Sequence, residues 1–160
     1  MEYNQITYYK TPIGIAKIVG NKFGIQSITV IDEEMETSVV IPMNLQKCLQ
    51  QLDEYFNGTR TVFDLKLNPQ GTGFQQRVWK ELLNVPHGKT RSYLEQSKKL
   101  GDVKAIRAVA SANGKNPIWI LIPCHRIIGS DGSLTGYAGG LWRKKWLLEH
   151  ENLSIQRSLF

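Results

Sequence analysis

The stretch SYLEQSKKLGDVKAIRAVASA, residues 92–112, decides the fold of the second half of the chain. It predicts two short helices, Ser92–Leu100 and Val103–Ala112, separated by a Gly101-Asp102 turn, with Ser92 as the N-cap of the first. Two short helices joined by a turn that contains glycine are typical of a helix-turn-helix. The stretch therefore indicates a helical unit of the kind that binds DNA.

The second of these helices has one apolar and one small-residue face. The residues expected to pack inward are Val103, Ile106, Val109 and Ala110. The opposite face, with the residue just beyond the helix, holds Lys104, Arg107, Ala108, Ser111 and Lys115. Small side chains permit close approach to a narrow groove, and Arg107 can enter that groove or the base stack, so the pattern favours DNA distortion over sequence recognition. An ordinary surface helix with exposed alanines is the alternative.

Charge is unevenly distributed along the chain. Residues 1–68 hold 6 Lys and Arg against 8 Asp and Glu, whereas residues 69–160 hold 14 against 6. The two halves therefore carry −2 and +8. A basic surplus confined to the half with the predicted helix-turn-helix favours a polyanionic partner, above all nucleic acid. A basic surface that serves only solubility is the alternative.

The first half predicts a small antiparallel sheet followed by a helix. Short runs rich in β-branched residues, separated by tight turns, indicate strands over 5–9, 15–19 and 25–31. A helix over 44–56 follows, and its apolar face holds Leu45, Cys48, Leu49, Leu52 and Phe56. Because Cys48 lies on that face, we expect it to pack as a small buried hydrophobe.

A connector over 61–73, with Pro69 and two glycines, separates the halves. A helix over 74–83 is expected after it, with Phe74, Val78, Leu82 and Leu83 on one side. We therefore predict an α/β protein of the α+β kind, with one domain over 1–68 and a second over 69–160. No run approaches the roughly 18 apolar residues of a membrane span, and no signal peptide is recognisable, so a cytoplasmic location is expected.

The segment 118–140 combines a cysteine, a histidine and many glycines. The apolar run 118–122 predicts a buried strand that ends at Pro123-Cys124-His125-Arg126, and a glycine-rich loop follows. A thiol with an ordinary pKa of about 8.5 needs a nearby base or positive charge to become a thiolate. The neighbouring histidine and arginine favour a reactive Cys124, although cysteine as a residue type is more often structural.

Taken together, these segments resemble the methylated-DNA–protein-cysteine methyltransferases, the single-use repair proteins for 6-O-alkylguanine. The resemblance is carried by IPCHR over 122–126, GYAGGL over 136–141 and KWLLEHE over 145–151. It extends upstream through Arg107-Ala108-Val109, Asn116-Pro117 and 74–79, and it is weaker over the first 68 residues. It implies a ribonuclease H-like N-terminal domain, a small antiparallel sheet with a helix, and a winged-helix-like helix-turn-helix DNA-binding domain.

The resemblance also implies catalytic roles. Cys124 would accept the alkyl group, His125 would act as its base through a water, and Glu151 would orient His125. Tyr93 would border the flipped base, where it can contact the 3′ phosphate and assist proton delivery to guanine. Asn116 would join the helix-turn-helix to the cysteine site.

Contacts with DNA and with the flipped base are implied in the same way. Arg107 would fill the space that the base vacates in the duplex. The backbone at Cys124 and Ile127 would accept from the guanine amino group, and Tyr137 with the Ala138 amide would face O6. The other residues expected on the DNA side are Lys104, Ala108, Ser111, Lys115 and Arg126.

The implied activity is that of a methylated-DNA–[protein]-cysteine S-methyltransferase. It would move the alkyl group of 6-O-methylguanine, and also of 4-O-methylthymine, in double-stranded DNA to Cys124 in one turnover with base flipping. We expect a monomer without cofactor, and no zinc, because no cysteine precedes Cys48 and no zinc-ligand spacing occurs. Trp119 stands where some relatives carry proline near the alkyl pocket, which leaves the range of tolerated alkyl groups open.

Two other classes of function remain open from the residues themselves. A pure DNA-binding module would explain the basic half, but it has no use for Cys124, His125 and Glu151 together. A thiol hydrolase would use Cys124 and His125, but it would leave the basic helix pair unexplained.

Overall fold

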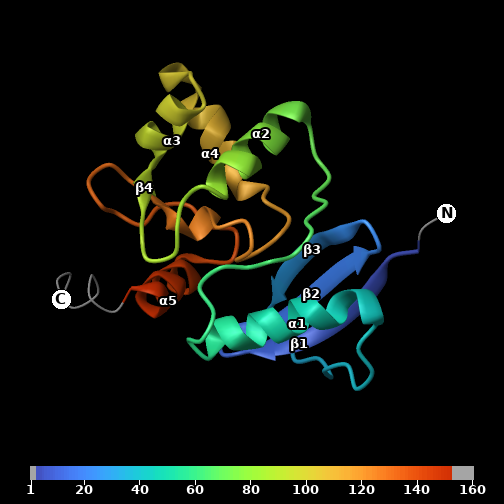
Figure 1. The fold of residues 1–160 in the computed structure, drawn as a ribbon. Helices are drawn as coiled ribbons and strands as arrows, with labels where there is room; N and C mark the ends of the chain where they lie inside the picture. The colour runs from blue at the N-terminus through green and yellow to red at the C-terminus, as the bar shows by residue number, and fades with distance from the viewer. Residues whose placement is uncertain (1–2, 153–160) are drawn as a thin grey trace. The chain divides into compact units, whose positions relative to one another are not determined.

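The computed structural model describes residues 3–152, and the contacts within it divide the chain into two compact units (Figure 1). The first unit comprises the chain up to Gln70 together with Pro117–Trp119, and the second comprises Gly71–Asn116 and the chain from Ile120 onward. The mixed α/β architecture agrees with the predicted fold class. The return of residues 117–119 to the first unit was not predicted. No helix within residues 3–152 is long and apolar enough to cross a membrane.

The first unit is built on an antiparallel meander, which confirms the three predicted strands. Its strands pair in the order β1, β2, β3 and are β1 (Gln5–Thr11), β2 (Gly14–Asn21) and β3 (Gly24–Ile31). The register places Ile6 opposite Val19. The β2–β3 turn is closed by Asn21, whose Oδ1 accepts a hydrogen bond from the Phe23 amide at 2.8 Å. Gly24 follows with a φ of 131°, which residues with a Cβ rarely adopt.

Helix α1 (Met43–Phe56) packs against this sheet and completes the first core. Its buried residues are Leu45, Cys48, Gln51, Leu52 and Tyr55. Cys48 has no exposed surface, which confirms its predicted packing role. The buried aromatic side chain at the end of the helix is Tyr55, whereas Phe56, which was predicted on the buried face, is only half-buried.

The outer edge of β3 is covered by two later segments of the chain. The connector after α1 pairs with this edge in parallel at Leu67. Residues 117–119 pair with it at Ile28, whose amide donates to the Pro117 carbonyl at 2.9 Å. The Ile28 carbonyl accepts in turn from the Trp119 amide at 3.0 Å. The edge strand is therefore hydrogen-bonded on both sides.

The predicted strand over 118–122 is wrong in its backbone, although all five residues are buried as expected. Only Ile118 forms a bridge to β3, and turns follow it. Ile120 has a φ of 71°, a left-handed conformation that is costly for a β-branched residue and that interrupts the extended backbone of a strand. An apolar run alone does not distinguish a buried strand from a buried turn.

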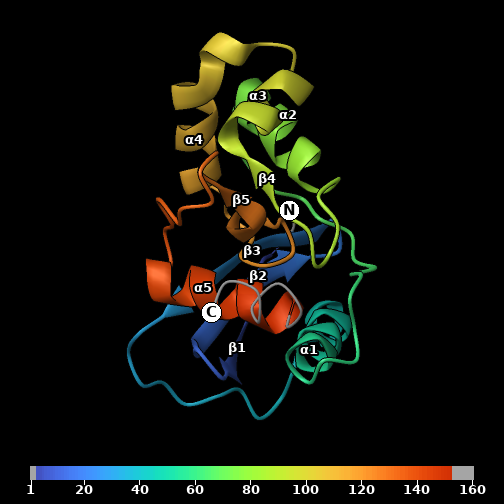
Figure 2. The same cartoon turned by 90° about the vertical axis from the view of Figure 1, so that its left-hand side faces the viewer.

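The second unit consists mainly of helices (Figure 2). Its elements are α2 (Gly73–Leu82), β4 (Arg91–Ser92), α3 (Tyr93–Lys99), α4 (Ile106–Gly114), β5 (Ile127–Ile128) and α5 (Leu141–Glu151). Capping boxes begin α2 at Thr72 and α3 at Ser92, so the predicted Ser92 N-cap is confirmed. Trp79 joins α2 to α4, since its Nε1 donates to the Ala112 carbonyl at 2.8 Å. β4 pairs in parallel with β5.

The helix-turn-helix is confirmed in outline and corrected in detail. The residues predicted as one helix over 103–112 form a 3-10 turn, η1 (Val103–Ala105), followed by α4, which runs on to Gly114. Asp102 caps the turn by accepting from the Lys104 amide at 2.9 Å. Val103, predicted to pack inward, is 48% exposed because it lies in this turn, and the inner face of α4 holds Val109, Ala112 and Asn113. A similar correction applies to α2. Leu83, which was predicted on its apolar side, is exposed just after the helix ends, and Trp79, which was not predicted there, is buried.

Candidate active site

Cys124 begins a single 3-10 turn, η2 (Cys124–Arg126), directly after Pro123. The Cys124 amide donates to the Ile122 carbonyl at 2.8 Å, and the Arg126 amide donates to the Pro123 carbonyl at 3.0 Å. Adjacent side chains in this turn have different surroundings, since Cys124 is partly exposed and His125 is completely buried. The turn therefore presents the sulfur while it holds the imidazole inside the unit.

Asn116, to which the resemblance assigned a linking role, contacts the cysteine directly. Its Nδ2 donates to the Ile122 carbonyl at 2.7 Å and to Cys124 Sγ at 3.3 Å. A hydrogen bond donated to sulfur stabilises the thiolate relative to the thiol. Asn116 therefore connects the end of α4 to the nucleophile and favours its reactive form.

His125 lies behind the cysteine and is held by Glu151 at the end of α5. His125 Nε2 and Glu151 Oε2 are 2.7 Å apart, and both side chains are buried. An ionised carboxylate can only accept a hydrogen bond, so a neutral His125 carries its hydrogen on Nε2. Its Nδ1 is then a hydrogen-bond acceptor, and this atom has no protein partner among residues 3–152. The pair has the arrangement of a base with an orienting acid.

Arg126 was predicted to face DNA, and the structure corrects this placement. The side chain is buried, with its Nε 2.7 Å from Glu151 Oε1 and its Nη2 3.0 Å from Glu151 Oε2. Its Nη1 donates to the Val85 carbonyl at 2.7 Å. Burial raises the pKa of Glu151, but His125 and Arg126 outweigh this effect and hold the pKa well below its usual range. Arg126 therefore holds the carboxylate that orients the histidine.

Lys144 is a member of the site that the sequence analysis missed. The side chain has no exposed surface, and its Nζ donates to the Thr135 carbonyl at 2.9 Å and to the Gly136 carbonyl at 3.4 Å. Burial lowers its pKa to about 8. Burial also raises the pKa of the Cys124 thiol, and the bond from Asn116 and the charge of Lys144 act in the opposite direction. A signal for Lys144 exists in α5, where it lies three positions before the apolar Leu147.

A cavity of about 420 Å³ opens beside the thiol, within the second unit. Its lining residues are Tyr93, Ile106, Arg107, Ala110, Asn113, Gly114, Cys124, Thr135, Gly136, Tyr137 and Ala138. The hydroxyl of Tyr93 donates to the Thr135 carbonyl at 3.0 Å, and burial raises the pKa of this phenol. The cavity therefore brings together four of the predicted site residues: Cys124, Tyr93, and Tyr137 and Ala138 of the glycine-rich loop.

Ile127 and Trp119 were also named in the sequence analysis, and both side chains are buried. Ile127 is fully buried at the start of β5, and within the described part of the chain it is not one of the lining side chains. Trp119 belongs to the first unit, where its ring lies 6.3 Å from the ring of Phe56.

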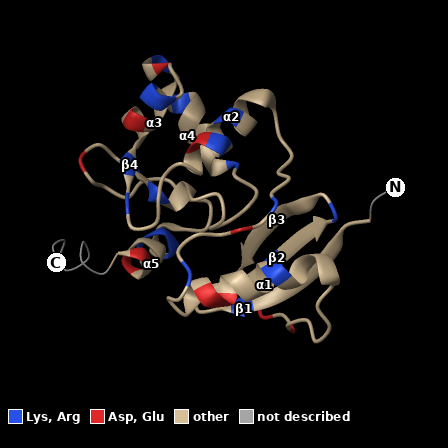
Figure 3. Cartoon of the chain, viewed as in Figure 1, with Lys and Arg blue, Asp and Glu red and all other residues tan. Residues whose placement is uncertain are grey.

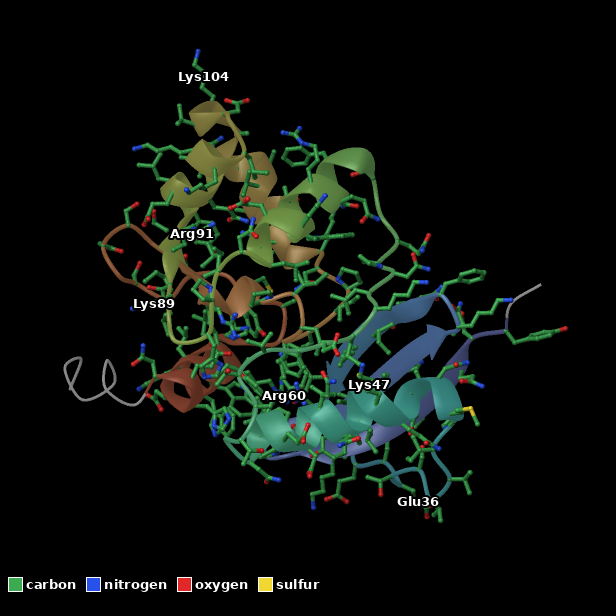
Figure 4. The ribbon with its side chains drawn as sticks, viewed as in Figure 1. Glu36, Lys47, Arg60, Lys89, Arg91 and Lys104 are labelled. Atoms are coloured by element: carbon green, nitrogen blue, oxygen red, sulfur yellow. The ribbon has the colours of Figure 1, made fainter. Side chains whose placement is uncertain are left out.

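The outer face of α4 agrees with the predicted small-residue surface. All five residues predicted for this surface are exposed, namely Lys104, Arg107, Ala108, Ser111 and Lys115. Arg107 differs from the others because it also lines the cavity. Lys104 extends away from the helix pair (Figure 4). Lys and Arg recur along α2, α3 and the helix-turn-helix segment (Figure 3), and Arg107 belongs both to this basic set and to the lining of the cavity.

The described residues hold no group of three or more His, Cys, Asp or Glu side chains placed to bind a metal ion. The polar groups around Cys124 are instead hydrogen-bond donors and acceptors and one buried ammonium. This set can activate a thiol toward an electrophilic carbon by removal of its proton and by stabilisation of the resulting charge.

Comparisons with known proteins agree with this site. Residues 73–153 match the family model described as "6-O-methylguanine DNA methyltransferase, DNA binding domain", and residues 5–69 match the ribonuclease-like domain of the same family. A methylated-DNA–protein-cysteine methyltransferase of Methanosarcina barkeri is 42% identical over 92% of this chain and 96% of its own length. One of Mycobacterium bovis is 44% identical over 90% of this chain and 92% of its own length.

Solved structures give the same result. The O6-methylguanine methyltransferase of Mycobacterium tuberculosis superposes with a TM-score of 0.84 at 40% identity, and 94% of each chain is covered. A structure of the Mycobacterium tuberculosis protein in complex with DNA gives a TM-score of 0.82 at 43% identity, with 91% of each chain covered. The cysteine turn, the helix-turn-helix and these comparisons lead to one conclusion: this chain belongs to the 6-O-methylguanine DNA methyltransferase family.

Proposed function

We propose that this chain repairs DNA as a methylated-DNA–protein-cysteine methyltransferase. The alkyl group of a 6-O-alkylguanine in duplex DNA is transferred to Cys124 Sγ, and 4-O-methylthymine is a second substrate. The observation that carries the proposal is the position of the Cys124 thiol in a cavity that also borders Arg107 of the helix-turn-helix. A reactive sulfur and an exposed basic helix share one site, which a pure binding module does not need and a thiol hydrolase does not explain.

The reaction is an in-line displacement at the alkyl carbon. The Cys124 Sγ–carbon bond forms as the carbon–O6 bond breaks, and guanine leaves after it takes up a proton. The thiol proton passes through a water to His125 Nδ1, whose acceptor state is fixed by the Nε2 contact with Glu151. Asn116 and Lys144 stabilise the developing thiolate. The thioether product has no second nucleophile to remove it, so each molecule reacts once.

The target base must leave the duplex before the sulfur can reach it. Extrusion costs a few kcal/mol of unstacking, and Arg107 offsets this cost when it enters the vacated space. In the cavity, Tyr93 borders the base and assists proton delivery, while Tyr137 and the Ala138 amide face O6. The backbone carbonyls of Cys124 and Ile127 accept from the guanine amino group.

The partner is double-stranded DNA. Lys104 and Lys115 contact phosphates, and the small side chains of Ala108 and Ser111 permit close approach of α4 to the groove. Residues 69–160 supply DNA binding and chemistry, and residues 1–68 form the N-terminal domain. The protein acts in the cytoplasm as a monomer and without a cofactor.

Intact-protein mass spectrometry tests the proposal. Incubation with a duplex that carries one 6-O-methylguanine should add a single methyl group per protein, and peptide mapping should place it on Cys124. Incubation with the unmodified duplex is the control. A protein that binds the methylated duplex and gains no mass would be a DNA-binding module, and repeated turnover on an ester would identify a hydrolase.

A further inference from the structure

A buried pair of side-chain amides links the two helices of the helix-turn-helix. Gln96 of α3 donates through Nε2 to Asn113 Oδ1 at 2.8 Å, and Asn113 of α4 donates through Nδ2 to Gln96 Oε1 at 2.8 Å. Gln96 has no exposed surface, and Asn113 is 7% exposed. The two reciprocal bonds fix the plane of each amide and determine which end carries the oxygen.

Besides its contact with Gln96, Asn113 lines the cavity beside Cys124. A primary amide has two N–H donors and two acceptor lone pairs on its oxygen. The bonds with Gln96 use one of each, which leaves one N–H and one lone pair on Asn113. Its closest companions along α4 in the cavity wall are Ala110 and Gly114, which have no polar side-chain atoms. The Asn113 amide is therefore the polar side-chain group on this part of the α4 wall, nearly two helical turns beyond Arg107.

We propose that Asn113 is a specificity-determining contact for the extruded purine, and that Gln96 is the positioning residue that fixes the orientation of its amide. Purine bases carry both donors and acceptors on their edges. An amide held in one orientation presents a fixed donor and acceptor to such a base, whereas a free amide can rotate and presents no fixed pattern. This inference rests on the proposed function, since it assigns the ligand of the cavity as a base.

A purely structural role for the pair makes a different prediction. If the amides only join α3 to α4, replacement of both by apolar residues of similar size should be nearly neutral, because no unpaired polar group stays buried. Replacement of one amide alone should destabilise the protein in either case. The double variant therefore separates the two roles.

The experiment compares Gln96→Leu, Asn113→Leu and the double variant with the wild-type protein. Transfer from 6-O-methylguanine as a free base is followed against base concentration, which gives a saturating rate and a half-saturation concentration. Thermal unfolding is measured in parallel. We expect both single variants to unfold at lower temperature and the double variant to recover most of the loss. In the double variant, the half-saturation concentration should still rise about tenfold, the equivalent of one hydrogen bond, with the saturating rate within about twofold of wild type.

Gln51 offers a matched control in the first unit. Its amide makes the same kind of reciprocal pair, since Nε2 donates to the Asp64 carbonyl at 3.2 Å and Oε1 accepts from the Asp64 amide at 2.9 Å. Gln51→Leu should lower the unfolding temperature and leave the half-saturation concentration unchanged. The isosteric Gln96→Glu adds a second test, because a carboxylate cannot donate to Asn113 Oδ1 and should also raise the half-saturation concentration.

The outcomes separate the inference from the proposed function. A double variant with wild-type half-saturation, or a Gln96→Glu protein with wild-type half-saturation, would overturn the inference while transfer itself still occurs. A wild-type protein that takes no methyl group from either the free base or the methylated duplex would overturn the proposed function first.

Discussion

The two cysteines of this chain are the same chemical group in opposite surroundings. Cys48 lies on the buried face of α1, where burial alone acts on its thiol and raises the pKa to about 12. Burial also raises the pKa of the Cys124 thiol, but a hydrogen bond from Asn116 and the charge of Lys144 act against it. The difference indicates that burial does not decide whether a cysteine is inert or reactive. The polar groups placed around the sulfur decide it.

Removal of each sulfur in turn is the strongest test of this difference. Cys124→Ala should abolish methyl transfer from a methylated duplex, because Cys124 is the one thiol among the described residues that line the cavity. Cys48→Ala should leave the transfer rate unchanged and lower the free energy of unfolding by about 1–2 kcal/mol through lost packing. The rate is measured by loss of the lesion from DNA with protein in excess. Lesion removal by Cys124→Ala would contradict the assignment of the acceptor.

The second test concerns Glu151, the buried carboxylate on the Cys124 side of this comparison. Arg126→Met removes a charged partner of Glu151 while His125 remains, and loss of one member of a buried ion pair costs about 3–5 kcal/mol. Denaturant titration should show this loss. Because Arg126 is enclosed by protein atoms, the salt dependence of non-specific DNA binding should stay as in wild type.

Lys104→Met is the control for that experiment. Its side chain extends into solvent, so the variant should keep its stability and lower the slope of log affinity against log salt by about one. A lower slope in Arg126→Met would return this arginine to the DNA surface and would contradict its placement in the structure.

A third and smaller effect is expected at the mouth of the cavity. Arg107→Ala should slow transfer from duplex DNA about tenfold to a hundredfold, because the extruded base loses a contact that offsets a few kcal/mol of unstacking. Transfer from the free base requires no extrusion and should change little. Lys104→Ala is the matched control, with weaker DNA binding and an unchanged free-base reaction. Equal losses on both substrates for Arg107→Ala would assign it to the pocket or the fold.

The smallest expected effect is a pH dependence of the free energy of unfolding, which the buried Lys144 contributes on the Cys124 side of the comparison. The pKa of Lys144 is about 8 in the folded protein and about 10.4 for an unfolded lysine. Between these values the unfolded chain binds more protons, so the contribution of this residue to the free energy of unfolding rises with pH. Below pH 8 the ammonium is charged in both states and its burial is fully unfavourable.

Denaturant titrations at pH 7.5 and pH 10 measure this contribution in wild type and Lys144→Met. The stability of wild type relative to the variant should rise by about 1–3 kcal/mol over this interval. The comparison with the variant cancels the groups that titrate in both proteins. A relative stability that stays constant or falls over the same interval would show that Lys144 keeps its charge in the folded protein.

Much of the fold could be predicted from local patterns. The meander was recognisable because each strand is short, rich in β-branched residues and ended by turn residues such as Asn21 and Gly24. The N-cap at Ser92 followed from its position before a helical pattern. The boundaries of α4 could not be predicted in this way. Asp102 caps a 3-10 turn before the helix begins, and the spacing of apolar residues does not distinguish such a turn from the first turn of a helix.

The site could be predicted in its nucleophile and base but not in its supporting contacts. Cys124, His125 and Glu151 were identified through the resemblance, and the structure places His125 against Glu151. The predicted position of Arg126 was wrong because an arginine in a basic half can contact either DNA or a buried carboxylate. Only the packing of the folded chain shows that it contacts Glu151. Lys144 was missed because lysine is rarely buried and nothing local in the sequence reveals the carbonyls that accept its hydrogen bonds.

The hydrogen bonds that residues 117–119 make along β3 also bear on how this chain folds. The N-terminal sheet lacks part of its edge until a segment from far along the chain reaches Ile28. During synthesis, the first unit therefore has an incomplete strand edge until residue 119 has left the ribosome. A chain ending at Gln70 would keep that edge open permanently, and open edges pair with one another. Such a fragment should aggregate, although its own sequence contains every strand of the meander.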